Sequence, residues 1–298
     1  MTGRLDGRVA FITGAARGQG RAHAIALARE GADVVCLDVP DALETLPYAP
    51  GTAEDLEQTV AAVEALDRRA IAVHGDVRRQ EDLDAAVERA VSDLGRLDVV
   101  VANAGIWALT PAWEITEQQW AEMIDVVLSG PWRTVKAAAP HLLAQGSGSV
   151  VLTSSVNGLE AGPRFAHYTA AKHGVIGLMR SLAVEIAPYG VRCNAICPGF
   201  VDTKMNDWQG SYDMMAGHPG GTPEDRAESA RNWHALAGLG MLTPETISRA
   251  VVFLASDDAV DITGVALPVD GGHMVLPSFN TAPVREPLAW SSTTSAAR

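Results

Sequence analysis

The sequence predicts an α/β fold in which helices cover both faces of a doubly wound parallel sheet. Short apolar runs alternate along the chain with longer segments of helical periodicity, and this rhythm is typical of parallel strands joined by right-handed helical crossovers. Three of the runs, at residues 34–35, 99–101 and 150–152, are continuously apolar. Strands that are buried on both faces have this pattern. We find no internal repeat and no second domain.

Seven strands and six longer helical segments follow from the periodicity. We predict strands at residues 8–13, 33–38, 70–75, 98–102, 149–154, 191–197 and 265–269. We predict helices at residues 18–30, 53–67, 80–94, 117–145 (mostly helical), 165–188 and 244–255. In the first helix, Ala22, Ile25 and Ala26 recur at helical spacing.

Three segments interrupt this rhythm. Residues 40–52 contain three prolines, and such a long link is either an exposed insertion or a loop that covers a ligand. Residues 202–243 carry several aromatic residues, methionines and glycines, and we predict a substrate lid there. Close to its end the chain has serine and threonine at 291–294, a composition typical of disorder. We therefore predict one domain over residues 1–272 and a tail over 273–298.

The composition limits the class of protein. The chain has 298 residues, 47% hydrophobic and 20% charged, with a net charge of −13. The negative charge argues against nucleic acid or an anionic membrane surface as a partner. No apolar run reaches the ~18 residues of a membrane span, and the first residues lack the regions of a signal peptide. Cys36, Cys193 and Cys197 form no disulfide framework or metal motif, which indicates buried thiols. We expect a soluble cytoplasmic protein without a bound metal.

A glycine-rich loop between the first strand and its helix predicts a dinucleotide site. Gly14, Gly18 and Gly20 lie there. Glycines at such a junction allow a tight turn and close approach to pyrophosphate, and the helix N-terminus offers free N–H groups. Asp38 ends the second strand, where a carboxylate accepts hydrogen bonds from both ribose hydroxyls and repels a 2′-phosphate. We predict NAD rather than NADP as the cofactor, although Arg17 partly offsets the repulsion.

A second pattern predicts acid–base chemistry on an alcohol and ketone pair. Tyr168 and Lys172 are four residues apart, and Ser155 lies thirteen residues before the tyrosine. On a helix, residues at this spacing share a face. A nearby ammonium group favours the phenolate and lowers the pKa of the phenol. We predict that Ser155 holds the substrate oxygen while Tyr168 transfers its proton.

Taken together, these motifs resemble the short-chain dehydrogenase/reductase family over residues 5–272. The matching pieces are residues 13–20, Asp76-Val77, residues 103–105, Ser155, Tyr168 with Lys172, Pro198-Gly199 and Thr203. The resemblance implies a three-layer Rossmann fold with a seven-stranded sheet. It also implies that Asp76 and Val77 contact adenine and that residues 198–203 position the nicotinamide carboxamide. The predicted cofactor-binding residues are Gly14, Arg17, Gly18, Gln19, Gly20, Asp38, Val39, Asp76, Val77, Asn103, Ala104, Gly105, Tyr168, Lys172, Pro198, Gly199, Val201 and Thr203.

One position departs from the family pattern. The family usually carries an asparagine where this chain has Val127. The resemblance implies that the asparagine side chain opens a helix kink, so that its backbone carbonyl binds a relay water beside the lysine. Valine lacks that side-chain bond but keeps the carbonyl. We expect the chemistry to persist, with a lower turnover or another route for the proton.

The chain also resembles a narrower group, the mycofactocin-associated dehydrogenases, which include enzymes similar to carveol dehydrogenase. The loop at residues 10–23, the insertion after Asp38 and the segment 132–137 carry this resemblance. It implies tightly held NAD that a peptide-derived redox cofactor reoxidises, and a homotetramer built through the helices at 117–145 and 165–188 and the last strand. The insertion at 40–52 would then cover the adenosine.

The predicted substrate pocket is apolar. We therefore expect a hydrophobic secondary alcohol, such as an alicyclic, terpenoid or steroid-like compound, and its ketone. The alternative is a non-catalytic NAD(H)-sensing regulator on the same fold, against which the intact Ser155, Tyr168 and Lys172 argue. A sugar-nucleotide epimerase would need a large polar C-terminal domain that the chain lacks. The predicted pocket residues are Ile106, Trp107, Asn157, Leu159, Phe165, Phe200, Met205, Trp208, Met214 and Met215.

Overall fold

A seven-stranded parallel sheet forms the centre of the molecule. The computed structural model describes residues 3–39 and 43–276. The strand order is β3-β2-β1-β4-β5-β6-β7, and every neighbouring pair is parallel. The chain order reverses between β1 and β4, and ligands of doubly wound sheets bind at the carboxyl ends of the strands at such a point. The strands are β1 (Val9–Thr13), β2 (Asp33–Asp38), β3 (Ala70–His74), β4 (Val99–Ala102), β5 (Gly148–Thr153), β6 (Val191–Pro198) and β7 (Ala266–Val269).

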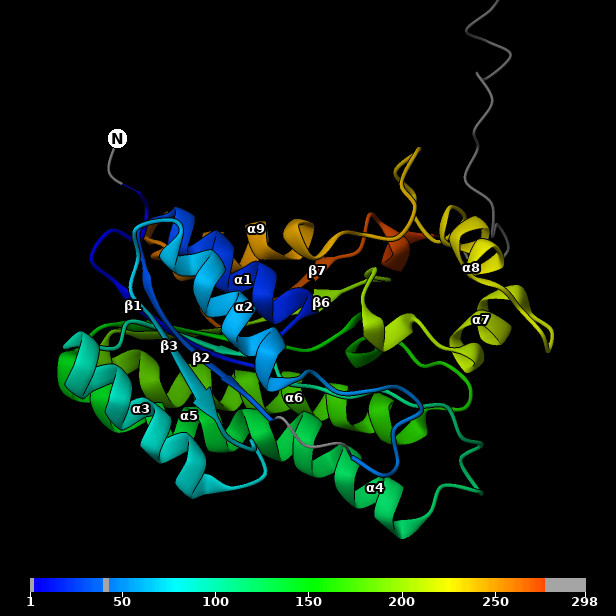
Figure 1. Cartoon of the computed structure of the whole chain (residues 1–298), viewed down its shortest axis with the longest axis horizontal. Helices are drawn as coiled ribbons and strands as arrows, with labels where there is room; N and C mark the ends of the chain where they lie inside the picture. The colour runs from blue at the N-terminus through cyan, green and yellow to red at the C-terminus, as the bar shows by residue number, and fades with distance from the viewer. Residues whose placement is uncertain (1–2, 40–42, 277–298) are drawn as a thin grey trace, which may run out of the picture.

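Helices cover both faces of the sheet, and the fold is the predicted three-layer arrangement (Figure 1). One layer contains α1 (Gly18–Arg29), α2 (Ala53–Glu64) and α9 (Pro244–Ala255). The other contains α3 (Gln80–Leu94), α4 (Glu117–Ile124), α5 (Gly130–Gln145) and α6 (Ala166–Ile186). Two short helices, α7 (Gln209–Ala216) and α8 (Pro223–Ala230), lie at one end of the sheet. None of the described helices is long and apolar enough to cross a membrane.

The core divides into two apolar layers, one on each face of the sheet. Phe11 and Val100 pack with the layer that contains α3, α5 and α6. Their neighbours Ile12 and Val101 pack with the layer that contains α1 and α9. Successive strand residues point to opposite faces, so a strand covered on both sides needs an apolar residue at every position. This explains the continuously apolar runs in the sequence.

The predicted helix at 117–145 is interrupted. Between α4 and α5 lies the π-helix η1 (Asp125–Ser129), in which the Gly130 N–H donates to the Asp125 carbonyl five residues back. Three other helices end earlier than predicted: α1 ends at Arg29, α2 ends at Glu64, and α6 ends at Ile186 before a single 3₁₀ turn, η3 (Ala187–Tyr189). The remaining 3₁₀ turns are η2 (Val156–Gly158), η4 (Lys204–Asn206), η5 (Asp257–Ala259) and η6 (His273–Val275).

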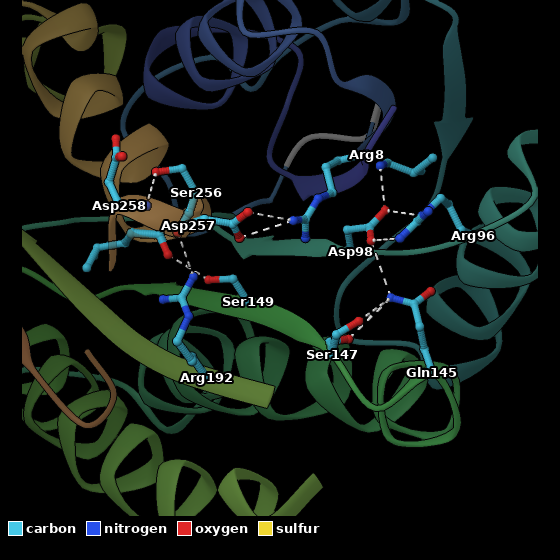
Figure 2. Close-up of polar contacts among 12 residues, drawn as sticks. Arg8, Arg96, Asp98, Gln145, Ser147, Ser149, Arg192, Ser256, Asp257 and Asp258 are labelled. Carbon is cyan, nitrogen blue, oxygen red and sulfur yellow. Dashed lines mark hydrogen bonds and ion pairs between the residues drawn. The ribbon is translucent and has the colours of Figure 1, made fainter. Parts of the chain in front are cut away.

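Charged groups tie the amino ends of the strands together. Asp98, which is 1% exposed, accepts hydrogen bonds from Arg96 at 2.7 and 2.6 Å and from the Val9 N–H at 2.9 Å. Arg8 binds both oxygens of Asp257 at 3.1 Å (Figure 2). The Asp98 contact with Val9 fixes β1 beside β4, and the Arg8 contact ties the start of β1 to η5, both at the end of the sheet opposite to the predicted site. The three cysteines are free and buried, as predicted.

Candidate active site

A cavity of about 580 Å³ lies where β1, β4, β5 and β6 end. Gly14 follows β1, Asn103 follows β4, Ser155 follows β5, and Gly199 follows β6; all four residues line the cavity. Segments far apart in the sequence therefore meet at the point where the strand order reverses. All of the predicted cofactor-binding residues line this cavity: Gly14, Arg17, Gly18, Gln19, Gly20, Asp38, Val39, Asp76, Val77, Asn103, Ala104, Gly105, Tyr168, Lys172, Pro198, Gly199, Val201 and Thr203.

The loop before α1 fits a bound pyrophosphate. Gly14 has φ +69°, and a Cβ atom there would lie 2.8 Å from the Ala104 Cα. A Cβ atom at Gly20 would lie 1.9 Å from the Gly14 carbonyl oxygen. The N-cap residue Arg17 makes no side-chain capping bond, so the first N–H groups of α1 point toward the cavity without a side-chain acceptor. These features fit an anionic ligand at the helix N-terminus.

Asp38 lies beside this loop at the end of β2. Its Oδ2 accepts the Ala16 N–H at 2.7 Å, and its Oδ1 accepts the Val39 N–H at 2.8 Å. Burial raises the pKa of the Asp38 carboxyl above its usual value, while these two backbone bonds and the charge of Arg17 act in the opposite direction. The bonds fix the plane of the carboxylate and leave lone pairs that face the cavity, as a ribose-binding group requires.

Asn103 connects the ends of β1 and β4. Its side-chain Nδ2 donates to the carbonyls of Thr13 and Gly14 at 3.1 and 3.2 Å. The Thr13 hydroxyl in turn accepts the backbone N–H groups of Asn103 and Ala104 at 3.1 and 3.2 Å. Asn103 therefore holds the glycine-rich loop against the end of β4, in addition to lining the cavity.

Ser155, Tyr168 and Lys172 meet at the end of β5. All three are buried, with 7%, 8% and 3% exposure. The Lys172 ammonium donates to the Thr153 carbonyl at 2.7 Å and lies 5.6 Å from the centre of the Tyr168 ring. The Ser155 side chain lies near enough to the Tyr168 phenol to act on its pKa, and the Asn157 N–H donates to the Ser155 hydroxyl at 3.1 Å. The helical spacing thus brings together the predicted acid–base group.

Burial is the largest cause of the pKa shifts of Tyr168 and Lys172. It raises the pKa of Tyr168 to about 12, against the opposing effect of the Ser155 side chain. It lowers the pKa of Lys172 to about 8. The sequence analysis predicts that the lysine lowers the pKa of Tyr168. The structure raises this pKa instead, so the predicted direction is wrong. Removal of both groups from water penalises the charged form of each, and the Lys172 ammonium is already bound to a backbone carbonyl.

The helix kink persists although Val127 replaces the family asparagine. Val127 is completely buried and lies within the π-helix η1. A π turn contains one extra residue and leaves one carbonyl without a helical donor. Residue 131, four positions after Val127, is a proline and has no N–H to donate to the Val127 carbonyl. Pro131 thus provides a backbone reason for the kink that requires no polar side chain at 127.

The substrate end of the cavity is apolar, with two corrections to the predicted set. Leu159 does not line the cavity and is 37% exposed. Leu159 is in the loop after η2, where the sequence has no periodicity from which the orientation of a side chain can be predicted. Trp208 also does not line the cavity, because it packs behind Trp107, with ring centres 5.5 Å apart. The predicted residues that do line it are Ile106, Trp107, Asn157, Phe165, Phe200, Met205, Met214 and Met215.

Two groups of lining residues were missed by the sequence analysis. Leu43, Leu46, Tyr48, Pro50 and Gly51 come from the insertion after β2, so its described part is a wall of the cavity rather than an exposed insertion. The prolines and the single tyrosine of this segment were the only signals. Residues 40–42 of the insertion lie outside the described part.

The second missed group joins the loop after β5 to the end of the described chain. His273 binds the Glu160 carboxylate at 2.8 Å and stacks on Trp233, with ring centres 3.5 Å apart. All three residues line the cavity. The domain boundary predicted at residue 272 therefore falls directly before a residue of the cavity wall, while residues 277–298 of the predicted tail lie outside the described residues.

Comparisons with known proteins agree with this geometry. A family model described as Enoyl-(Acyl carrier protein) reductase matches residues 14–274. The chain is 50% identical to a (−)-trans-carveol dehydrogenase of Rhodococcus erythropolis, over 90% of this chain and 98% of that protein. The crystal structure of carveol dehydrogenase from Mycobacterium avium in complex with NAD aligns with a TM-score of 0.89 and 46% identity, covering 92% of this chain and all of that one.

A crystal structure of a short chain dehydrogenase from Mycobacterium paratuberculosis bound to NAD aligns with a TM-score of 0.83 and 40% identity. It covers 92% of this chain and all of that chain. The match with the family model extends over most of the sequence, and each of the three relatives covers 90% or more of this chain. The chain belongs to the short-chain dehydrogenase/reductase family.

Proposed function

We propose that the chain is an NAD-dependent dehydrogenase that interconverts a hydrophobic secondary alcohol and its ketone. One observation carries the proposal: Ser155, Tyr168 and Lys172 meet in the same cavity as a glycine-rich loop that fits a dinucleotide. The relatives named as carveol dehydrogenase act on an alicyclic alcohol by name, and one was solved with NAD. The regulator alternative gains no support from these relatives.

The proposed mechanism uses the three buried side chains. When bound, NAD⁺ supplies the hydride acceptor and a positive charge in the site. Ser155 holds the substrate oxygen by a hydrogen bond. In oxidation, Tyr168 must first be ionised, and its phenolate then takes the proton of the alcohol; in reduction, the phenol returns that proton. Lys172 places a cation near the phenol and binds the ribose. The Asn157 N–H fixes the Ser155 hydroxyl that orients the substrate.

The lining of the cavity supports the hydrophobic substrate class. Trp107, Phe165, Phe200, Met205 and Met214 line its substrate end, and an apolar wall favours a ligand with little charge. We assign the predicted cofactor roles to the residues that line the other end. Asp38 binds the ribose hydroxyls, Asp76 and Val77 contact adenine, and residues 198–203 position the carboxamide.

Three finer points belong to the same proposal. NAD is held tightly under residues 43–52 and is reoxidised by a peptide-derived redox cofactor. The hydrogen bond from Arg17 Nη2 to the Ala49 carbonyl, at 2.6 Å, supports this cover over the cofactor.

The protein is a homotetramer formed through α4, α5, α6 and β7. Exposed apolar side chains on the three helices support this interface: Trp120, Trp132 and Val184. The protein is cytoplasmic, which its free buried cysteines support.

The substitution Tyr168→Phe tests the proposed reaction. We expect turnover to fall by about 10²–10⁴ because the proton-transfer group is lost, while the affinity for NAD stays within about twofold of the wild type. NADH absorbance with (−)-trans-carveol and with cyclohexanol measures turnover, and equilibrium dialysis measures NAD binding. Tyr189→Phe is the control, because Tyr189 is 53% exposed and outside the cavity. Substantial activity in Tyr168→Phe contradicts the assignment.

A further inference from the structure

The insertion after β2 contributes a residue to the substrate end of the cavity. Tyr48 lines the cavity, and its hydroxyl oxygen accepts the backbone N–H of Trp107 at 2.9 Å. Its neighbour Ala49 is bound through its carbonyl to the side chain of Arg17. Tyr48 is therefore anchored on both sides, by the loop after β4 and by the N-terminus of α1. A loop that borders the cofactor end at Gly51 and Asp38 thus reaches the substrate end within a few residues.

Tyr48 completes a continuous aromatic wall that ends at the catalytic tyrosine. We define this aromatic wall as Tyr48, Trp208, Trp107, Phe165 and Tyr168, of which Trp208 lies behind the surface of the cavity and the other four line it. The distances between successive ring centres are 6.5, 5.5, 6.1 and 6.4 Å. Each lies within the range in which aromatic pairs attract each other. The wall fixes the position of Tyr48 relative to the reacting oxygen, and it joins the insertion to the lid residue Trp208.

The Tyr48 hydroxyl is available as a hydrogen-bond donor. A phenol has one proton to donate in addition to its acceptor capacity. The hydroxyl accepts from Trp107, and none of the hydrogen bonds within residues 3–39 and 43–276 uses its proton. Burial raises the pKa of the Tyr48 phenol, and the bond from Trp107 acts in the opposite direction. The group therefore remains protonated at neutral pH and brings a single polar donor to a mostly apolar wall.

We propose that Tyr48 is a specificity-determining residue whose hydroxyl donates a hydrogen bond to a second oxygen atom of the substrate, remote from the reacting carbon. The preferred substrate class is then a cyclic secondary alcohol with a second hydroxyl or carbonyl oxygen. The inference rests on the proposed function. In an apolar pocket, one placed polar group fixes the orientation of the ligand, and the aromatic wall puts this group at a defined distance from Tyr168.

A pair of probes that differ in one hydroxyl tests the proposal. Cyclohexanol and trans-1,4-cyclohexanediol share the reacting group and the ring, and only the diol carries the remote oxygen. In Tyr48→Phe, which keeps the ring and removes the hydroxyl, we expect kcat/KM for the diol to fall about 2- to 10-fold, as for the loss of one neutral hydrogen bond. The value for cyclohexanol stays within the error of the wild type. Tyr189→Phe is the matched control and leaves both values unchanged.

Each other outcome rejects the inference in a distinct way. An equal fall for both alcohols indicates that the hydroxyl only supports the loop. A loss of bound NAD with an unchanged ratio between the two alcohols indicates that the hydroxyl serves the cofactor. An unchanged ratio with unchanged NAD content shows that Tyr48 does not select the substrate. The proposed function fails separately, if the wild-type protein with NAD oxidises neither these alcohols nor (−)-trans-carveol.

Discussion

Burial moves the pKa values of Tyr168 and Lys172 in opposite directions, and both movements favour the neutral form. The phenol is raised to about 12 and the ammonium is lowered to about 8. Between about pH 8 and about pH 12, both side chains are neutral in the chain alone, so it does not hold a tyrosinate beside an ammonium ion. The proton of Tyr168 is therefore ready to be donated, and alcohol oxidation depends on the charge that the cofactor adds to the site.

His23 is a second buried titratable group, and its effect is on stability. It is fully buried between α1 and α9, and its Nδ1 lies 2.8 Å from the Ser248 hydroxyl. That hydroxyl donates to the Pro244 carbonyl, so the His23 Nδ1 is the donor of the pair. The other ring nitrogen, Nε2, has no partner among the described residues. Burial lowers the pKa of His23 from 6.5 to about 3.

We predict that this histidine makes the fold less stable in acid. The unfolded chain binds a proton at His23 below pH 6.5, while the folded chain does so only near pH 3. The stability that His23 contributes is complete above pH 6.5 and is lost as the pH falls toward 3. In His23→Gln, the urea midpoint should therefore decrease less between pH 7 and pH 5 than in the wild type. His74→Gln, at an exposed position, is the control, and equal slopes for all three proteins contradict the prediction.

At the scale of single elements, η1 shows how one backbone feature replaces a side chain. The π turn and the missing N–H of Pro131 leave the Val127 carbonyl without its α-helical donor. The neighbouring Val126 lines the cavity. If that carbonyl takes part in the proton route, as the family resemblance implies, Pro131 is the positioning residue in this chain.

We predict that Pro131→Ala lowers kcat about tenfold and changes KM little, because a new N–H at residue 131 competes for the carbonyl at residue 127. Steady-state kinetics with (−)-trans-carveol measure both constants. A second substitution, Val127→Asn, should restore kcat in the Pro131→Ala protein. Pro140→Ala is the matched control, because Pro140 lies inside α5 and away from the kink. If Pro131→Ala retains full activity, the proline has no such role.

The same element marks a limit of prediction from sequence. The strands were predictable because every position of a doubly covered strand is apolar, and the site was predictable because fixed spacing places Tyr168 and Lys172 on one helix face. The kink at 125–129 did not follow from periodicity, because the helical pattern continues across it, and only the family resemblance implied a kink there. Leu159 and Trp208 were misplaced because a loop has no period from which the direction of a side chain follows. The raised pKa of Tyr168 depends on burial by segments distant in sequence, which spacing does not report.

At the scale of the whole molecule, three separate parts of the chain line the cavity beside the strand ends: residues 43–52, the segment 203–233 with α7 and α8, and the turn η6. The Thr45 hydroxyl donates to the Glu122 carboxylate and ties the first of these parts to α4. The sequence distance between Thr45 and Glu122 explains why the position of the insertion did not follow from local patterns.

We predict that Thr45→Val speeds the release of NAD about 2- to 10-fold, because one hydrogen bond that holds the cover is lost. The rate is measured by displacement of bound NADH with excess NAD⁺, followed by fluorescence. Thr243→Val, at an exposed position outside the cavity, is the control. A release rate equal to that of the wild type would show that the cover does not limit exchange.

The contact of His273 with Glu160 and Trp233 has a practical consequence for anyone who shortens or fuses this chain. A truncation directly after Gly272 would remove an aromatic ring from the cavity wall and leave the Glu160 carboxylate without its imidazole. An affinity tag joined at that point would place foreign residues against bound alcohol. Kinetic constants from such a protein would describe an altered binding site, so expression designs should retain η6 through Leu276.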